Sequence, residues 1–209
     1  MLASVTACAT KSASSKSAST ASGECHYAKS ARAAAKHVGI PPNAIASPAA
    51  QTATLMTNHG VITLRFNTAA ARCTVNSFGY LASKHYFDAT SCHRLTTSGI
   101  YVLQCGDPTG TGGGGPGYTF ADENLRGATY PAGTVAMANS GPGTNGSQFF
   151  LVYADTTLAP NYTPFATIAN GLDVVKTIAS AGSDNSHGPG DGAPLLPTTI
   201  VQLVVASSS

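Results

Sequence analysis

Short hydrophobic runs with polar residues at alternate positions follow one another from Thr52 onward, and glycine, asparagine or proline separates them. This alternation is typical of strands with one buried face. The first two runs flank Asn58-His59-Gly60, a hairpin signal. We expect strands at 53–57, 61–67, 91–95, 101–105, 134–138, 148–153, 165–168 and 199–205.

Two segments instead carry their apolar residues at helical spacing. Residues 69–83 place Val75, Phe78 and Ala82 on one face, and residues 172–179 form the second helix. About eight short strands with two helices predict a mainly β fold, a closed eight-stranded antiparallel barrel capped by two α-helices, because closure leaves no sheet edge exposed. Periodicity alone does not distinguish this barrel from a sandwich.

The chain before this domain has a different pattern. Tyr27, Ala31, Ala34 and Val38 recur at helical spacing, and the run 39–42, Gly-Ile-Pro-Pro, would end a helix. We therefore expect a short helix and a linker in 25–50, ahead of a domain at 51–206. Residues 9–24 consist almost entirely of Ala, Ser, Thr and Lys, which have little to bury, so they predict a flexible tether.

Composition changes this picture mainly through charge. Charged residues make up 10% of the chain, against roughly 25% in typical globular proteins, while 43% is hydrophobic. That hydrophobic content excludes disorder over the whole chain, and no stretch approaches the ~20 apolar residues of a membrane span. A formal net charge of +2 excludes nucleic-acid binding by the whole domain through electrostatics. Residues 1–48 have five basic side chains against Glu24, so a basic tail precedes a body of net charge −2.

The N-terminus contains a candidate lipidation site. The tetrad Val5-Thr6-Ala7-Cys8 resembles the lipobox of bacterial lipoproteins, in which the cysteine is lipidated after cleavage. A signal segment needs about 7–15 apolar residues and a basic region before the cleavage site, and only seven residues precede Cys8. Either residues 1–24 begin inside a longer signal, or the match is chance. In the first case Cys8 and the basic tail would anchor the protein to a membrane surface.

Four further cysteines, Cys25, Cys73, Cys92 and Cys105, allow three pairings that spacing cannot separate. The chain contains no CxxC, and the wide spacings do not match a compact zinc site. Two disulfides in an exported protein are the preferred interpretation, and four buried thiols in a cytosolic protein are the alternative.

The usual catalytic motifs are absent. The chain has no HExxH, no GxSxG and no glycine loop that ends in Gly-Lys-Ser/Thr, and the run 112–115 is best interpreted as a tight surface loop. Instead, polar residues lie within or at the ends of apolar strands: His93-Arg94, Gln104, Asn139 and Gln148. Phe149 and Phe150 are adjacent on a strand, so only one of them can face the core.

These residues carry a resemblance. The segments FDATSCHRLTTSG, LQCGDPTGTGGGGPGYTFADE and GTVAMANSGPGTNGSQFF resemble the cyclophilin-type peptidyl-prolyl isomerases, over about Thr52 to Val205. The resemblance implies the eight-stranded barrel with two capping helices, and isomerisation of X–Pro bonds in folding polypeptides. The four cysteines also resemble those of exported actinobacterial members, which implies an extracytoplasmic, secreted or surface-anchored protein.

The resemblance implies a role for each matching residue. Arg94 matches the family's catalytic arginine, and the substrate groove would consist of His93, Tyr101, Val102, Gln104, Ala138, Asn139, Gln148, Phe150, Leu158 and Tyr162. Between Arg94 and Gln104 the chain is two residues longer than the common form, so Tyr101 and Val102 are matched less directly than the rest.

Three positions depart from the family pattern: Leu158 replaces a common tryptophan, Tyr162 a common histidine, and Ala166 a usual glycine. The first two changes put cyclosporin binding in doubt more than catalysis, because the indole is chiefly a drug contact. The implied partners are proline-containing polypeptides, with no nucleic acid, no cofactor and no metal, and we expect a monomer. A binding module of the same fold with little turnover is the alternative function.

Overall fold

A computed structural model describes residues 24–47 and 49–207; Cys8 and the expected tether lie outside these residues. The N-terminal half contains β1 (Tyr27–Lys29), β2 (Ala50–Thr57), β3 (Gly60–Phe66), α1 (Arg72–Ser83), β4 (Thr90–Ser91), β5 (Arg94–Thr96) and β6 (Val102–Cys105). The C-terminal half contains β7 (Tyr118–Phe120), β8 (Thr134–Met137), β9 (Phe149–Val152), β10 (Pro164–Asn170), α2 (Leu172–Ser180), β11 (Asp191–Gly192) and β12 (Thr199–Ser207). Neither helix in this part of the chain is long and apolar enough to cross a membrane.

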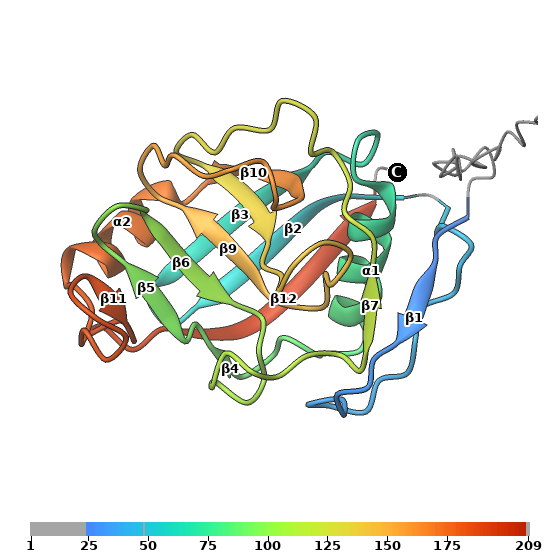
Figure 1. The fold of residues 1–209 in the computed structure, drawn as a ribbon, viewed down its shortest axis with the longest axis horizontal. Coiled ribbons are helices and arrows are strands. Elements are labelled where there is room, and N and C mark those ends of the chain that lie inside the picture. The colour runs from blue at the N-terminus through green and yellow to red at the C-terminus, as the bar shows by residue number, and fades with distance from the viewer. Residues whose placement is uncertain (1–23, 48, 208–209) are drawn as a thin grey trace, which may run out of the picture.

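Ten of the strands form one curled antiparallel sheet in the order β11-β5-β6-β9-β8-β10-β3-β2-β12-β4. Its two ends meet in one segment, residues 90–96, because β4 pairs with β12 while β5 pairs with β6. Counted as one strand, this segment completes eight strands, and β11 is an addition beside β5. Figure 1 shows β5, β6 and β9 in front of β2, β3 and β12, with α1 and α2 at opposite ends. The predicted mainly β barrel with two helices is confirmed.

The core lies inside this sheet and follows the alternation of the strands. Leu55, Ile62 and Leu64 are buried at alternate positions and belong to the same core cluster as Phe78 of α1, whose ring lies 5.3 Å from that of Phe149 of β9. Strand alternation places one face inward, so the outer face of β5, β6, β8 and β9 remains available for a site.

Helix α1 begins at Arg72, later than the predicted residue 69. Its first amides are satisfied from outside the helix: Cys73 and Thr74 donate backbone N–H groups to the carboxylate of Glu123, over 3.0 and 2.8 Å. A carboxylate at this end is favourable because it also faces the positive end of the helix dipole.

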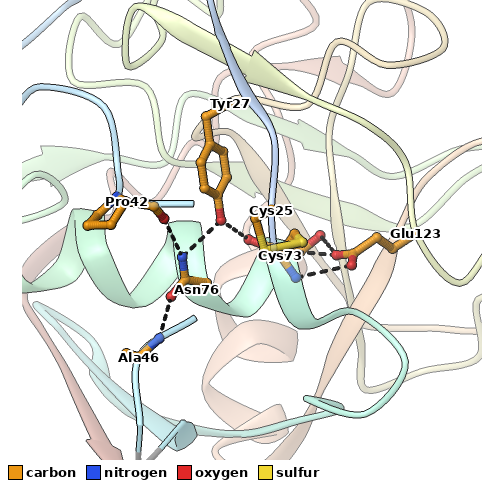
Figure 2. The surroundings of a disulfide bond; sticks show 8 residues. Cys25, Tyr27, Pro42, Ala46, Cys73, Asn76 and Glu123 are labelled. Atoms are coloured by element: carbon orange, nitrogen blue, oxygen red, sulfur yellow. Dashed lines mark hydrogen bonds between the residues drawn. A yellow bond between two sulfur atoms is a disulfide. The ribbon is translucent and has the colours of Figure 1, made fainter. Parts of the chain in front are cut away.

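The helix predicted within 25–50 is wrong. Residues 27–29 form β1, which pairs antiparallel with β7, and the rest of the segment is irregular. Contacts that the local pattern cannot reveal hold it there: a disulfide joins Cys25 to Cys73 of α1, and the Tyr27 hydroxyl donates to the Cys73 carbonyl over 2.8 Å (Figure 2). An alanine-rich face offered little burial to favour a helix instead.

Both predicted disulfides form, and the structure decides their pairing as Cys25–Cys73 and Cys92–Cys105. The second lies at the break between β4 and β5, and it ties this break to the end of β6. It therefore fixes the strand that carries Arg94.

Candidate active site

Cross-strand pairing places the site residues in one row. Arg94 of β5 is paired with Gln104 of β6, Gln104 with Phe150 of β9, and Phe150 with Ala136 of β8. Paired residues share a face of the sheet, and here it is the outer one. The neighbour Phe149 belongs to the main core, so the two adjacent phenylalanines face opposite sides, as predicted.

An apolar cup occupies one end of this row. Its buried residues form a cluster separate from the main core: Val102, Tyr130, Ala136, Phe150 and Val152. The rings of Phe150 and Tyr162 meet edge to face at 5.6 Å. The Tyr130 hydroxyl donates to the Tyr162 carbonyl over 2.8 Å and accepts from its N–H. The cup therefore has a fixed shape, and Ile100, Ala128, Ala138 and Leu158 also pack around it.

The guanidinium of Arg94 lies at the other end of the row and is oriented by Asp191 of β11. Nε donates to Oδ1 over 2.7 Å and Nη2 donates to Oδ2 over 2.6 Å, a bidentate geometry. This ion pair holds the pKa of the Asp191 carboxyl below its usual range, since a nearby cation favours the charged form. Nη1 makes one long contact, 3.4 Å to Oε1 of Gln104, so donors remain for a substrate.

Two amides continue the network away from Arg94. Gln104 donates from Nε2 to Oε1 of Gln148 over 2.8 Å, and Gln148 donates to the carbonyls of Gly112 and Gly114. Asp107 supports the same loop by accepting the Gly114 N–H over 2.9 Å. The glycine-rich loop thus packs against the site by its backbone and is less isolated than the predicted surface loop.

His93 precedes Arg94 and is buried, with 9% of its surface exposed. Within the described residues neither ring nitrogen has a hydrogen-bond partner. Burial lowers the pKa of its imidazole, because the charged form would lose its hydration. The ring is therefore a neutral wall of the cavity next to Arg94, which Gly110–Gly112, His187 and Asp191 also line.

Most of the predicted site residues gather on this face, but Tyr101 does not join the cup. It packs beside the main core, with its ring 5.9 Å from that of Tyr153. Tyr101 lies just before β6, which begins at Val102, whereas Ile100 packs against the cup. Asn139 lies at the far rim, where its Nδ2 donates to the Asn161 carbonyl over 2.8 Å.

Sequence reasoning missed Tyr130, Ile100 and Asp191. Tyr130 is isolated between loops, and β11 is only two residues long, so neither belongs to a periodic pattern. Asp191 reaches Arg94 across 97 positions of sequence. In residues 24–47 and 49–207, no group of three His, Cys, Asp or Glu side chains could hold a metal ion.

The comparisons with known proteins agree with this geometry. Residues 52–205 match the family model described as cyclophilin type peptidyl-prolyl cis-trans isomerase/CLD. The chain is 48% identical over 196 residues to a probable peptidyl-prolyl cis-trans isomerase B of Mycobacterium leprae, covering 86% of this chain and 65% of that protein. A protein of the same description from Mycobacterium tuberculosis is 44% identical over 197 residues, 87% of this chain and 63% of the relative.

Solved structures give the same answer. A crystal structure of a Cryptosporidium parvum cyclophilin type peptidyl-prolyl cis-trans isomerase matches with a TM-score of 0.66 at 29% identity, covering 77% of this chain and 99% of that one. A second structure of that protein, in the presence of the dipeptide Ala-Pro, matches with a TM-score of 0.65 at the same identity, covering 76% and 100%. The chain spans 65% and 63% of the length of the two mycobacterial relatives, and it belongs to the cyclophilin-type peptidyl-prolyl cis-trans isomerase family.

Proposed function

We propose that the protein is a peptidyl-prolyl cis-trans isomerase that accelerates rotation about X–Pro bonds in polypeptides outside the cytoplasm. The observation that carries the proposal is the position of Arg94 in one row with Gln104 and Phe150. Neighbouring strands lie about 4.8 Å apart. A long arginine side chain can therefore reach a proline ring that rests on Phe150.

Rotation is slow because it breaks amide resonance, against a barrier of ~18–20 kcal/mol. No covalent bond is made or cleaved, so a catalyst needs to bind the twisted amide better than either planar form. The cup around Phe150 would hold the pyrrolidine ring, and Gln104 with the Asn139 backbone would fix the flanking peptide. An Nη donor of Arg94 would donate to the proline nitrogen, whose lone pair becomes available only as resonance is lost. This hydrogen bond is strongest in the transition state.

The proposal predicts a large effect at Arg94. Loss of one donor of this kind costs about 2.7–4 kcal/mol, so Arg94→Ala should lower kcat/KM for a proline tetrapeptide at least about a hundredfold. Thermal unfolding of the same variant checks that the fold is intact. Arg94→Lys keeps the charge but loses the planar fork, so it should recover little of the rate. A folded Arg94→Ala variant with the wild-type rate would remove Arg94 from this role.

The same assay decides between catalysis and simple binding. Leu158 and Tyr162 support a binding module of the same fold, because they occupy positions where the family commonly has tryptophan and histidine, at the edge of the cup. A module would bind the tetrapeptide without accelerating its isomerisation, in wild type and Arg94→Ala alike.

A location outside the cytoplasm is supported by the two disulfides, Cys25–Cys73 and Cys92–Cys105. Such bonds persist in oxidising compartments and are rare in the cytosol. We propose in addition that Cys8 is lipidated and that the basic tail lies at a membrane surface. Mass spectrometry of the native protein would test this: a chain that retains Met1 and an unmodified Cys8 would contradict it.

A further inference from the structure

A second groove adjoins the row of site residues. It has a volume of about 360 Å³, and one wall consists of Gln104, Asn139 and Gln148, which also border the proposed proline site. Its lining also includes Ser30, Arg32, Ala33 and the glycine-rich loop 112–117, to which Gln148 is hydrogen-bonded. Residues 30–33 lie before the segment 52–205 that matches the family model, so the part of the lining that they form is an addition to the matched segment.

Several contacts fix residues 30–33 in place. Ser30 and Ala35 donate backbone N–H groups to the carbonyls of Gly117 and Gly115, over 2.9 and 2.8 Å. Before residues 30–35 in the sequence, β1 pairs with β7. After them, the Nζ of Lys36 donates to the carbonyls of residues 86 and 88. The disulfide at Cys25 anchors the start of the segment on α1 (Figure 2). In Figure 1 the segment runs along the outer side of β7.

The charge of the groove comes from Arg32. Among the described lining residues it is the one with an ionised side chain; the others are glycine, proline, alanine, tyrosine and neutral polar residues. Its Nη1 donates to the Gly113 carbonyl over 2.6 Å, and among residues 24–47 and 49–207 no acceptor is bonded to the other N–H groups of the guanidinium. Within the part of the chain that the structure describes, no carboxylate forms an ion pair with it.

We infer that this groove binds a side chain of the polypeptide whose proline occupies the cup, and that Arg32 selects an acidic one. The inference rests on the proposed function for the position of the proline. A carboxylate in the groove would meet a planar guanidinium suited to bidentate contact. A lysine or arginine side chain there would meet repulsion. The segment before the family domain is thus a determinant of substrate preference.

The test uses peptides that differ at one position. Each peptide contains one proline with four residues before it and four after it. One of these eight residues is Glu, Gln or Lys, and the other seven are Gln. Isomerisation is measured by NMR exchange, which needs no coupling protease. At low salt, we expect kcat/KM to be about three- to fivefold higher for Glu than for Gln at one position at least, a size set by an exposed ion pair. The preference should fall at high salt because the pair is screened.

Variants separate Arg32 from general charge effects. Arg32→Gln should abolish the Glu preference, and Arg32→Glu should shift the preference to Lys. Lys29→Gln removes the same charge three residues away, outside the groove lining, and should leave the preference unchanged. Wild type that turns over all peptides equally, or a preference that survives Arg32→Gln, would overturn the inference and leave the proposed isomerase intact. If no peptide is turned over, the proposed function fails, and the Kd values of the Glu and Gln peptides then decide the role of Arg32 on their own.

Discussion

Replacement of Asp191 by asparagine would test how the catalytic geometry is held. The change keeps the size of the side chain but removes its charge and one of its two acceptor oxygens. Arg94 would lose one of the two hydrogen bonds that orient its guanidinium, those of 2.7 and 2.6 Å to Oδ1 and Oδ2. The hydrogen bond to the asparagine oxygen and the long contact of 3.4 Å to Gln104 would remain, and together they fix the plane of the group less well than the bidentate pair.

The size of the fall in kcat can be estimated from the energy of the lost hydrogen bond and from the exposure of the two side chains. Hydrogen bonds to charged groups contribute about 1.5–3 kcal/mol. The side chains of Arg94 and Asp191 are 34% and 27% exposed, so water would compensate for part of the loss. We therefore expect a cost to the transition state of about 1–2 kcal/mol, a five- to thirtyfold fall in kcat. The effect must stay below that of Arg94→Ala, because Asp191 acts only through the arginine.

The assay is the isomerisation of a proline tetrapeptide, with kcat and KM determined separately. Asp191→Asn should lower kcat and leave KM close to wild type, since the cup that we propose for the proline ring is untouched. Asp184→Asn is the matched control: Asp184 accepts the N–H groups of Ser186 and Ala193 in the same loop and does not contact Arg94. In the Arg94→Ala background, Asp191→Asn should have no further effect. An equal loss in the two aspartate variants, or an additive loss in the double variant, would contradict a role for Asp191 in orienting Arg94.

Three further predictions concern stability. Gly114→Ala should lower the free energy of unfolding, measured by urea titration, by about 1–3 kcal/mol, because the new Cβ would lie 2.0 Å from Oδ1 of Asp107. Gly115→Ala is the control and should be neutral, because its Cβ would have no atom of the described residues within 4 Å. The double variant Cys25→Ser, Cys73→Ser should lose up to about 4 kcal/mol in the same measurement, because the bond closes 48 positions of chain; an unchanged midpoint would contradict a fixed N-terminal segment. Burial lowers the pKa of His93 below the unfolded value of about 6.5, so its contribution to the free energy of unfolding is present above that value and is lost as the pH falls toward the folded pKa. In that pH range the free energy of unfolding of wild type should fall, relative to that of His93→Gln, by up to about 1.4 kcal/mol per pH unit. Parallel pH profiles of the two proteins would contradict this.

The barrel could be predicted because strand burial leaves a local signal. Alternation identified the eight strands, and it also implied that one of Phe149 and Phe150 faces outward. The N-terminal segment carried a misleading local signal, since its alanines at helical spacing bury little, while its structure depends on β7 and on Cys73. Contacts across 46 to 48 positions do not appear in a local pattern.

The site was predictable to the extent that its residues lie in family motifs. Arg94, Gln104, Gln148 and Phe150 come together as the resemblance implied. Tyr101 and Val102 were matched across a longer segment; Val102 belongs to the cup, whereas Tyr101 packs beside the main core. Asp191 was beyond such reasoning, because a two-residue strand gives no periodicity and its partner is remote.

The chain has few charged residues, so the ion pair between Arg94 and Asp191 calls for an explanation. Of the ion pairs among residues 24–47 and 49–207, two involve histidine, and the third joins Arg94 to Asp191. A partly exposed pair contributes little to stability, typically about 0–1 kcal/mol. The barrel has its stability from a buried core and two disulfides, so it does not need this pair to fold. The pair is better explained by the task of holding one guanidinium beside an apolar cup, and Asp191→Asn should therefore change kcat far more than Tm.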